Sequence, residues 1–259
     1  DFSVIAAARG REAVVNTLLI SALSVLCAGV LGTALALVIH RYTFPGRNVL
    51  AGLAYLPLAL PPLVGTLAFY YIIGRDGFLL RALGQWLRAK DLVIPGPAAI
   101  LIIHAYSFYV YFYAMVLAAL ERSDPSLVEA ARSLGATRAR AFFKVTLPLL
   151  MPALMGAALL VFMSSAASFS APYFFGEGYP MLSVEIFNAY TNAQFPQGLA
   201  LTLLLAVVSL SGLLVFRSTN TGSAGGSKGA RRALRAVGRR SRRRSLWVLP
   251  ESARRLRDA

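Results

Sequence analysis

Residues 129–148 read EAARSLGATRARAFFKVTLP and lie between two long apolar runs, 98–120 and 148–171. The stretch is charged, is interrupted by Gly135 and ends in a proline, which is more than a simple connecting loop requires. Glycine commonly ends a helix in the left-handed conformation, and proline fits the first turn of a new helix. The pattern predicts a helix that ends at Gly135 and a second helix that starts near Thr137 and enters the next apolar run.

The first of these helices carries start signals. Asp124 or Ser126 can cap its N-terminus, Pro125 suits the first helical position, and Ser126 with Glu129 has the spacing of a capping box. Its apolar positions, spaced i, i+3, i+4 and i+7, are Leu127, Ala130, Ala131 and Leu134. This narrow stripe has two open interpretations: another protein docks on it, or Ala130 and Ala131 pack against the chain's own apolar segments.

The apolar runs indicate a membrane protein. Apolar residues make up 57% of the 259-residue chain and charged residues only 14%, whereas a soluble domain carries about a quarter charged residues. A helix needs roughly 20 apolar residues to cross a bilayer, and the following segments meet that length: 13–40, 49–73, 98–120, 148–171 and 197–216. Pro57, Pro61 and Pro62 are expected to kink or break the second. We therefore predict an all-α, polytopic transmembrane bundle of about five spans.

The positive charge orients these spans. One set of segments carries 20 of the 26 Lys and Arg residues, 13 of them in the last segment: 40–48, 121–147 and 217–259. The other set carries six: 1–12, 74–97 and 176–196. We therefore place the first set in the cytoplasm.

Three parts follow along the chain. We expect an external segment at 1–12, a transmembrane domain at 13–216, and a basic, Gly/Ser-rich tail or linker at 217–259. The tail is expected to lie near anionic lipid head groups rather than to bind nucleic acid. On the outer side, 77–90 has the spacing of an interfacial helix, and 181–193 fits either a short helix or an ordered loop.

Polar side chains inside the spans are candidates for a translocation path. They are Ser164, Ser165, Ser168 and Ser170 in the fourth span and Tyr106 and Tyr109 in the third. Packing between helices is the alternative for the serines, and a hydrogen-bonded packing role is the alternative to an iron ligand for His104. We find no His/Cys ligand cluster, paired carboxylates or phosphate-binding glycine loop in the sequence. No catalytic residue, metal site or directly bound cofactor is therefore predicted.

The loop also resembles a known signature. Glu129-Ala130-Ala131, three residues, Gly135, nine residues and then Val145-Thr146-Leu147-Pro148 resemble the EAA motif of the membrane subunits of binding-protein-dependent ABC importers, with Val145 in place of isoleucine. The resemblance implies the type I importer permease fold, with 121–147 as the cytoplasmic coupling loop. It further implies that a separate ATP-hydrolysing subunit contacts Glu129, Ala130, Ala131, Gly135, Leu147 and Pro148.

Two further stretches, FPGRNVLAGLAYLPLALPPLVGTLAFYYIIG and SSAASFSAPYFFG, resemble permeases for ferric iron and, more loosely, those for thiamine, polyamines, sulfate and phosphonates. We therefore expect ferric iron as the substrate.

The chain resembles the first half of a fused permease, with a short permease that dimerises as the alternative. The resemblance implies a multi-pass protein of the bacterial inner membrane that is not an enzyme. Its partners would be an external binding protein, ATPase subunits that use ATP and Mg, and a second permease half. A membrane scaffold or receptor acting through the basic tail is the alternative from another class.

Overall fold

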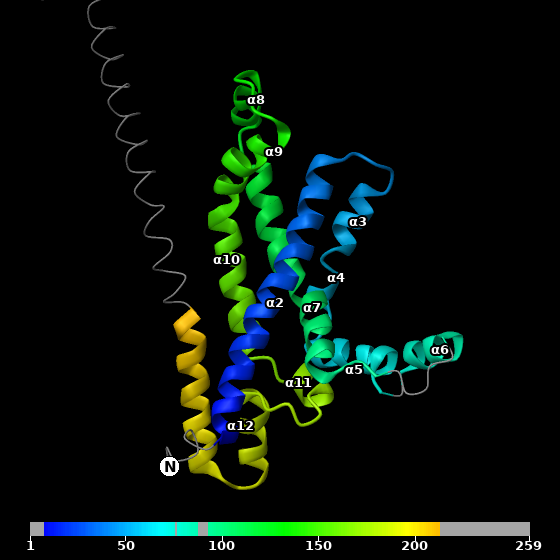
Figure 1. The fold of residues 1–259 in the computed structure, drawn as a ribbon, viewed down its shortest axis with the longest axis vertical. Coiled ribbons are helices and arrows are strands. Elements are labelled where there is room, and N and C mark those ends of the chain that lie inside the picture. The colour runs from blue at the N-terminus through cyan, green and yellow to red at the C-terminus, as the bar shows by residue number, and fades with distance from the viewer. Residues whose placement is uncertain (1–7, 76, 88–92, 213–259) are drawn as a thin grey trace, which may run out of the picture. The chain divides into compact units, whose positions relative to one another are not determined.

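The computed structural model describes residues 8–75, 77–87 and 93–212, and its regular elements there are helical. Figure 1 shows them in chain order. They are α2 (Ala8–Arg41), α3 (Arg47–Leu53), α4 (Leu56–Ala59), α5 (Pro62–Ile73), α6 (Phe78–Leu87), α7 (Gly96–Glu121), α8 (Pro125–Ser133), α9 (Arg138–Ala141), α10 (Leu147–Ala166), α11 (Ser170–Phe175), α12 (Leu182–Thr191) and a last helix, Phe195–Gly212. The predicted all-α class is confirmed.

The long helices α2, α7 and α10 form the centre of the described part, because α2 packs along α7 and α10 packs against both. The approach of α2 to α7 is close at Gly32. A Cβ atom on Gly32 would overlap the carbonyl oxygen of Tyr109 and lie 2.7 Å from Cβ of Phe112. Small residues permit such backbone contact between membrane helices. Tyr113 and Leu150 fill the core beside this contact and are fully buried.

Short helices lie at the two ends of this three-helix core (Figure 1). Helix α8 connects the C-terminus of α7 to the segment that leads into α10, and α12 packs against α2. An ion pair of 3.2 Å between Arg9 and Glu185 ties α12 to the start of α2. A second, also 3.2 Å, joins Arg75 to Glu177. Both ion pairs lie at the end that the charge pattern assigns to the outside.

Five apolar helical stretches are long enough to cross a membrane, as predicted. They are Arg9–Arg41, Pro62–Trp86, Gly96–Glu121, Arg138–Ala166 and Phe195–Gly212. The first helix begins at Ala8, so the predicted external segment 1–12 is helical in its last part. The rest of that segment, the end of the fifth predicted span and the tail 217–259 lie outside the described residues.

The second predicted span, 49–73, is wrong in extent. The segment is divided into α3, α4 and α5, and the break between α4 and α5 falls at Leu60 and Pro61, both with extended ψ values of 127° and 134°. Proline disfavours helical backbone in the residue before it, which accounts for a break at this place. By length and composition alone, the apolar stretch starts instead at Pro62, after the break, and extends to Trp86 through α5 and α6.

The fourth predicted span, 148–171, is also corrected, at both ends. Helix α10 stops at Ala166, and the chain becomes helical again only at Ser170, where α11 starts. At the other end the helix does not begin at Pro148, because α9, a π-helical turn at Phe142–Thr146 and α10 follow without a gap. Pro148 lacks a donor and its ring crowds the carbonyl four residues earlier, so the wider π turn just before it accommodates the proline.

The short helix expected at 77–90 on the outer side is present as α6. Helix α6 exposes 65% of Phe78 and 80% of Trp86, while Leu80 is buried. An exposed aromatic face of this kind is typical of a helix that lies in a membrane interface. The segment 181–193, for which the sequence allowed a helix or a loop, contains helix α12.

Candidate functional site

Helix α8 begins at a side-chain cap. The backbone N–H of Ser126 donates a hydrogen bond of 2.9 Å to Oδ1 of Asp124, so Asp124 rather than Ser126 is the capping residue. The same hydrogen bond holds the pKa of Asp124 below its usual value, because it favours the ionised carboxylate. Leu127 occupies the third helical position, and the capping box expected of Ser126 and Glu129 is therefore not used.

The end of α8 is the sharp turn predicted at Gly135. This residue is left-handed, with φ of 84°, and the space around its Cα is open. The N–H of Ala136 donates to the carbonyl of Ala131 at 3.1 Å, and the N–H of Gly135 donates to that of Arg132 at 2.9 Å. These two bonds form a Schellman motif, which a glycine at this position permits without steric cost.

The apolar stripe of α8 lies largely uncovered. Leu127 is 47% exposed and Leu134 is 89% exposed, and Ala130 between them is also exposed. Ala131, on the edge of the stripe, is half-buried. Of the two interpretations left open by the sequence, packing against the chain's own spans is therefore not observed for Ala130.

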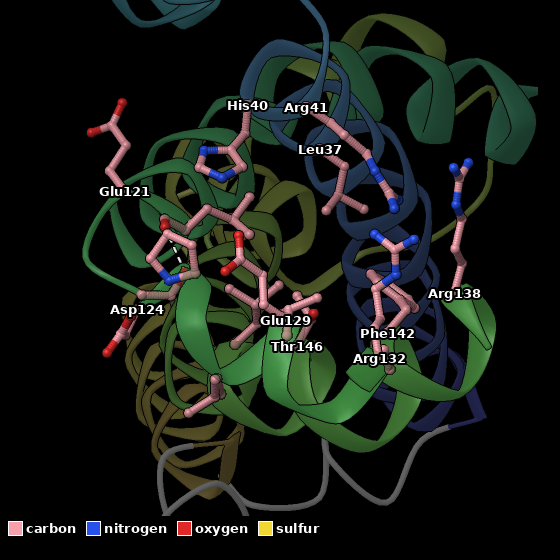
Figure 2. A pocket seen from close by; sticks show the side chains of 17 residues that line it. Leu37, His40, Arg41, Glu121, Asp124, Glu129, Arg132, Arg138, Phe142 and Thr146 are labelled. Atoms are coloured by element: carbon pink, nitrogen blue, oxygen red, sulfur yellow. Dashed lines mark hydrogen bonds between the residues drawn. The ribbon is translucent and has the colours of Figure 1, made fainter. Parts of the chain in front are cut away.

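Behind α8 lies a hollow of about 640 Å³, bounded by α8, α9 and the adjacent ends of α2, α7 and α10. Figure 2 shows the carboxylates Glu121, Asp124 and Glu129 toward one side of this hollow and the guanidinium groups of Arg41, Arg132 and Arg138 toward the other. His40, at the C-terminal end of α2, is exposed and lines the same hollow. Charge is thus separated across the space between α8 and the bundle.

The remaining signature residues lie on another element. Leu147 and Pro148 form the first turn of α10, where Leu147 is half-buried and Pro148 exposed. Helix α8 contacts both α9 and the π-helical turn that precede them. The signature therefore covers a surface helix and the start of the long helix to which it is joined.

A second cluster of polar residues surrounds His104, in the first half of α7. Its Nδ1 lies 2.9 Å from Ser24 Oγ and 3.0 Å from Ser165 Oγ, and its Nε2 lies 3.0 Å from Ser168 Oγ. The imidazole is 1% exposed. These contacts join α2, α7 and α10 through one ring, so Ser165 and His104 have the interhelical packing geometry that the sequence left as an alternative.

The predicted path residues divide between this cluster and a neighbouring cavity of about 150 Å³. Tyr106, Ser168 and Ser170 line the cavity, whereas Ser164 and Ser165 do not. Tyr109 also lies elsewhere, and its hydroxyl donates to the carbonyl of Ala54 at 3.0 Å.

Sequence reasoning missed Thr66, which lines the same cavity and whose hydroxyl lies 3.0 Å from Ser170 Oγ. A single threonine within an apolar run was the available signal. Among the described residues no group of three or more His, Cys, Asp or Glu is placed to hold a metal ion.

Comparison with known proteins agrees with the EAA signature. Residues 28–220 match the family model described as binding-protein-dependent transport system inner membrane component. The chain is 35% identical over 201 residues to the molybdenum transport system permease protein ModB of Escherichia coli K12, covering 77% of this chain and 87% of that protein. It is 32% identical over 210 residues to the sulfate transport system permease protein CysT of the same organism, covering 79% and 73%.

A relative named for ferric transport matches differently. The ferric transport system permease protein FbpB of Actinobacillus pleuropneumoniae is 30% identical over 202 residues, which is 75% of this chain but only 29% of that protein. Among solved structures, a bacterial alginate ABC transporter in complex with a pentasaccharide-bound periplasmic protein superposes with a TM-score of 0.67 at 21% identity, covering 83% of this chain and 79% of the matched one. This similarity supports the fold.

These matches establish the general role of the chain. It is a multi-pass inner membrane permease subunit of an ABC importer, and it works with an ATPase and a periplasmic binding protein. The subunit is not itself catalytic and binds no cofactor, since ATP is used by the partner ATPase. The chain belongs to the family of binding-protein-dependent transport system inner membrane components.

Proposed function

We propose that this permease carries a tetrahedral oxyanion, molybdate or sulfate, delivered by the external binding protein. The observation that carries the proposal is the similarity to permeases named for molybdenum and sulfate transport, at 35% and 32% identity and over most of their own lengths. Ferric iron, expected from the sequence, is the second candidate, supported by 30% identity to a ferric transport permease over 29% of that protein.

The coupling function is assigned to α8. Leu127, Ala130 and Leu134 offer an exposed apolar stripe, and a helix of this size presented to a groove is a common mode of binding. The open space at Gly135 lets the partner ATPase approach the end of the helix. Ala131 lies on the edge of the stripe and belongs to the same contact surface, whereas Glu129 lines the hollow on the other side of the helix and would reach the ATPase from there.

Movement of α8 has a direct route into the membrane. Helix α8 contacts α9 and the π-helical turn, and these run without a gap into α10, beginning with Leu147 and Pro148. A displacement of α8 by the ATPase would therefore shift α10 against α2 and α7 as a rigid body. The ATPase would bias the permease between inward-open and outward-open states in this way.

Two further partners belong to the proposal. A second permease half, either a copy of this chain or a related domain, completes the passage. The basic tail at 217–259 lies near lipid head groups, where each Lys or Arg contributes about 1 kcal/mol of attraction to an anionic surface.

The substrate is tested by uptake. The chain is reconstituted in proteoliposomes with the ATPase and binding protein of its own system, and ATP-dependent accumulation of radioactive molybdate, sulfate and ferric iron is measured separately. We expect accumulation of molybdate or sulfate and none of ferric iron above the level without ATP. Accumulation of iron alone would overturn the oxyanion assignment while leaving the permease function intact.

A further inference from the structure

Two helix breaks that are far apart in sequence meet at one place inside the bundle. The first lies at Leu60–Pro61 between α4 and α5, and the second at 167–169 between α10 and α11. Residues next to both breaks line the 150 Å³ cavity, and so does His104 from the first half of α7. Irregular backbone at membrane depth is tolerated where it is buried in protein or lines a cavity, and broken helices often form the binding sites of transporters.

The side chains that line this cavity are suited to a particular class of ligand. Seven of them are polar, and all can donate a hydrogen bond: Thr66, His104, Tyr106, Ser107, Tyr111, Ser168 and Ser170. Among the described residues, the lining contains no Asp, Glu, Lys or Arg. Hard cations are usually held by oxygen ligands that include carboxylates, whereas a set of neutral donors suits an anion that carries many acceptor oxygens.

The hydrogen bonds at the cavity wall leave protons free for such an anion. Each serine hydroxyl has one proton to donate and two lone pairs to accept with. The one proton of the Thr66 hydroxyl lies within reach of two acceptors, the carbonyl of Pro62 at 2.9 Å and Ser170 Oγ at 3.0 Å. When Thr66 donates to Ser170, the Ser170 proton is available to a ligand. With the imidazole proton on Nε2, Ser168 Oγ accepts from His104, also at 3.0 Å, and its proton is available too. Two hydroxyl protons can then be donated into the same cavity.

The wall is fixed from behind, which holds these donors in place. Ser24 and Ser165 contact Nδ1 of His104 and set the ring orientation. The hydroxyl of Ser183 donates to the carbonyl of Ser168 at 2.7 Å and holds the broken segment itself. The cavity has room for about five water molecules at their liquid volume, which is sufficient for an ion of four oxygens around one central atom.

We propose that this cavity is a transient intramembrane binding site for a tetrahedral oxyanion, with Ser168 and Ser170 as donors oriented by His104 and Thr66. The inference rests on the proposed function and adds the place where the anion stops on its way. A site built from neutral hydroxyl groups binds weakly enough to release its ion, as passage through a membrane requires.

The test uses the assembled importer in proteoliposomes, with sulfate and molybdate as probes and ATP hydrolysis measured in parallel. The double variant Ser168→Ala, Ser170→Ala is expected to lower oxyanion uptake at least tenfold while ATP hydrolysis stays responsive to the loaded binding protein. The matched control removes two hydroxyls outside the cavity, Thr202→Ala with Ser211→Ala, and is expected to stay within twofold of wild type. Equal uptake by both double variants would overturn the site.

The sign of the ligand charge is tested by Ser168→Asp. A carboxylate in the cavity repels an oxyanion, so uptake is expected to fall further than in the alanine variant. Retained or increased uptake would mean that the cavity does not hold an anion. If wild-type importer carries no oxyanion at all, the proposed function fails. If it carries one and the cavity variants carry it equally well, only the site inference fails.

Discussion

The coupling helix and the intramembrane cavity are built in different ways. Helix α8, with both of its caps, is specified by the contiguous segment 124–136, and its functional face is exposed to solvent. The cavity takes its lining from three separate places, α4–α5, α7 and α10–α11, and exists only when these are packed together. A local change should therefore disable coupling alone, whereas the cavity should be sensitive to packing throughout the bundle.

The largest effect is expected for Leu134→Asp on α8. Leu134 is 89% exposed in this chain, so the substitution leaves the fold intact. In the complex it would bury an unpaired carboxylate, at a cost of about 3 kcal/mol, or roughly 100-fold in affinity for the ATPase. Binding of the purified permease to its ATPase measures this loss. Ser133→Asp places the same charge on an exposed flank of α8 and should weaken binding less than threefold. A similar loss in both variants would argue against a specific docking stripe.

The second effect tests whether the packing of α2 against α7 is independent of ATPase binding through α8. Gly32→Ala places a methyl group against the backbone of α7, where neither helix can yield easily, and overpacking of this kind costs about 1–3 kcal/mol. In Gly29→Ala the added Cβ meets only the ring of Phe112, at 3.2 Å, which can move. Thermal unfolding in detergent should show a clearly lower midpoint for Gly32→Ala than for Gly29→Ala. ATPase binding by the folded fraction should be unchanged in both, and a selective loss of binding in Gly32→Ala would contradict the independence of α8.

An intermediate effect is expected at the turn of α8. Gly135→Ala puts a Cβ on a residue with φ of 84°, which costs about 1–2 kcal/mol even though no atom obstructs it. We expect roughly tenfold weaker ATPase binding from this change. Gly135→Asn should lose less, because asparagine tolerates the left-handed region. Gly52→Ala, in open space on α3, is the control and should bind like wild type. Equal binding by all three variants would show that the turn is not needed.

The smallest effect concerns the cap of α8. Asp124→Ala removes the acceptor of the Ser126 N–H and should weaken ATPase binding roughly fivefold, whereas Asp124→Asn should retain the cap. The folded-state pKa of Asp124 is lowered, so its stabilising effect is present above the ordinary pKa of about 3.9 and is lost as pH falls through the lower value. The difference in ATPase affinity between the wild type and Asp124→Ala should therefore be the same at pH 7 and at pH 5.

The difference between a helix specified by one local segment and a cavity lined by distant segments also explains which features could be predicted from the sequence. The turn at Gly135 and the existence of α6 follow from local patterns, and they are present in the structure. The same patterns left the cap of α8 open between Asp124 and Ser126, and left 181–193 open between a helix and a loop. The apolar lengths also predicted five spans. The division of the second span was indicated by its prolines, although the boundaries were misplaced, because the apolar stretch begins only at Pro62, after the break, and extends to Trp86.

The break after Ala166 could not be predicted in this way. The segment SSAASFS contains neither proline nor glycine, and its break is held by tertiary contacts of Ser168 with His104 and Ser183. Thr66 was missed for the same reason, since its neighbour Ser170 is 104 residues away. Local signals fix the two ends of α8, while the cavity depends on which helices meet.

The most direct test measures ATP hydrolysis and oxyanion accumulation in the same proteoliposomes, for the wild type, Leu134→Asp and the double variant Ser168→Ala, Ser170→Ala. We predict that Leu134→Asp loses both activities, because the ATPase no longer docks. The serine variant should keep hydrolysis that responds to the loaded binding protein and lose accumulation at least tenfold. Accumulation that survives in the serine variant, or hydrolysis and transport that fall together in both variants, would contradict the separation of coupling helix and passage site.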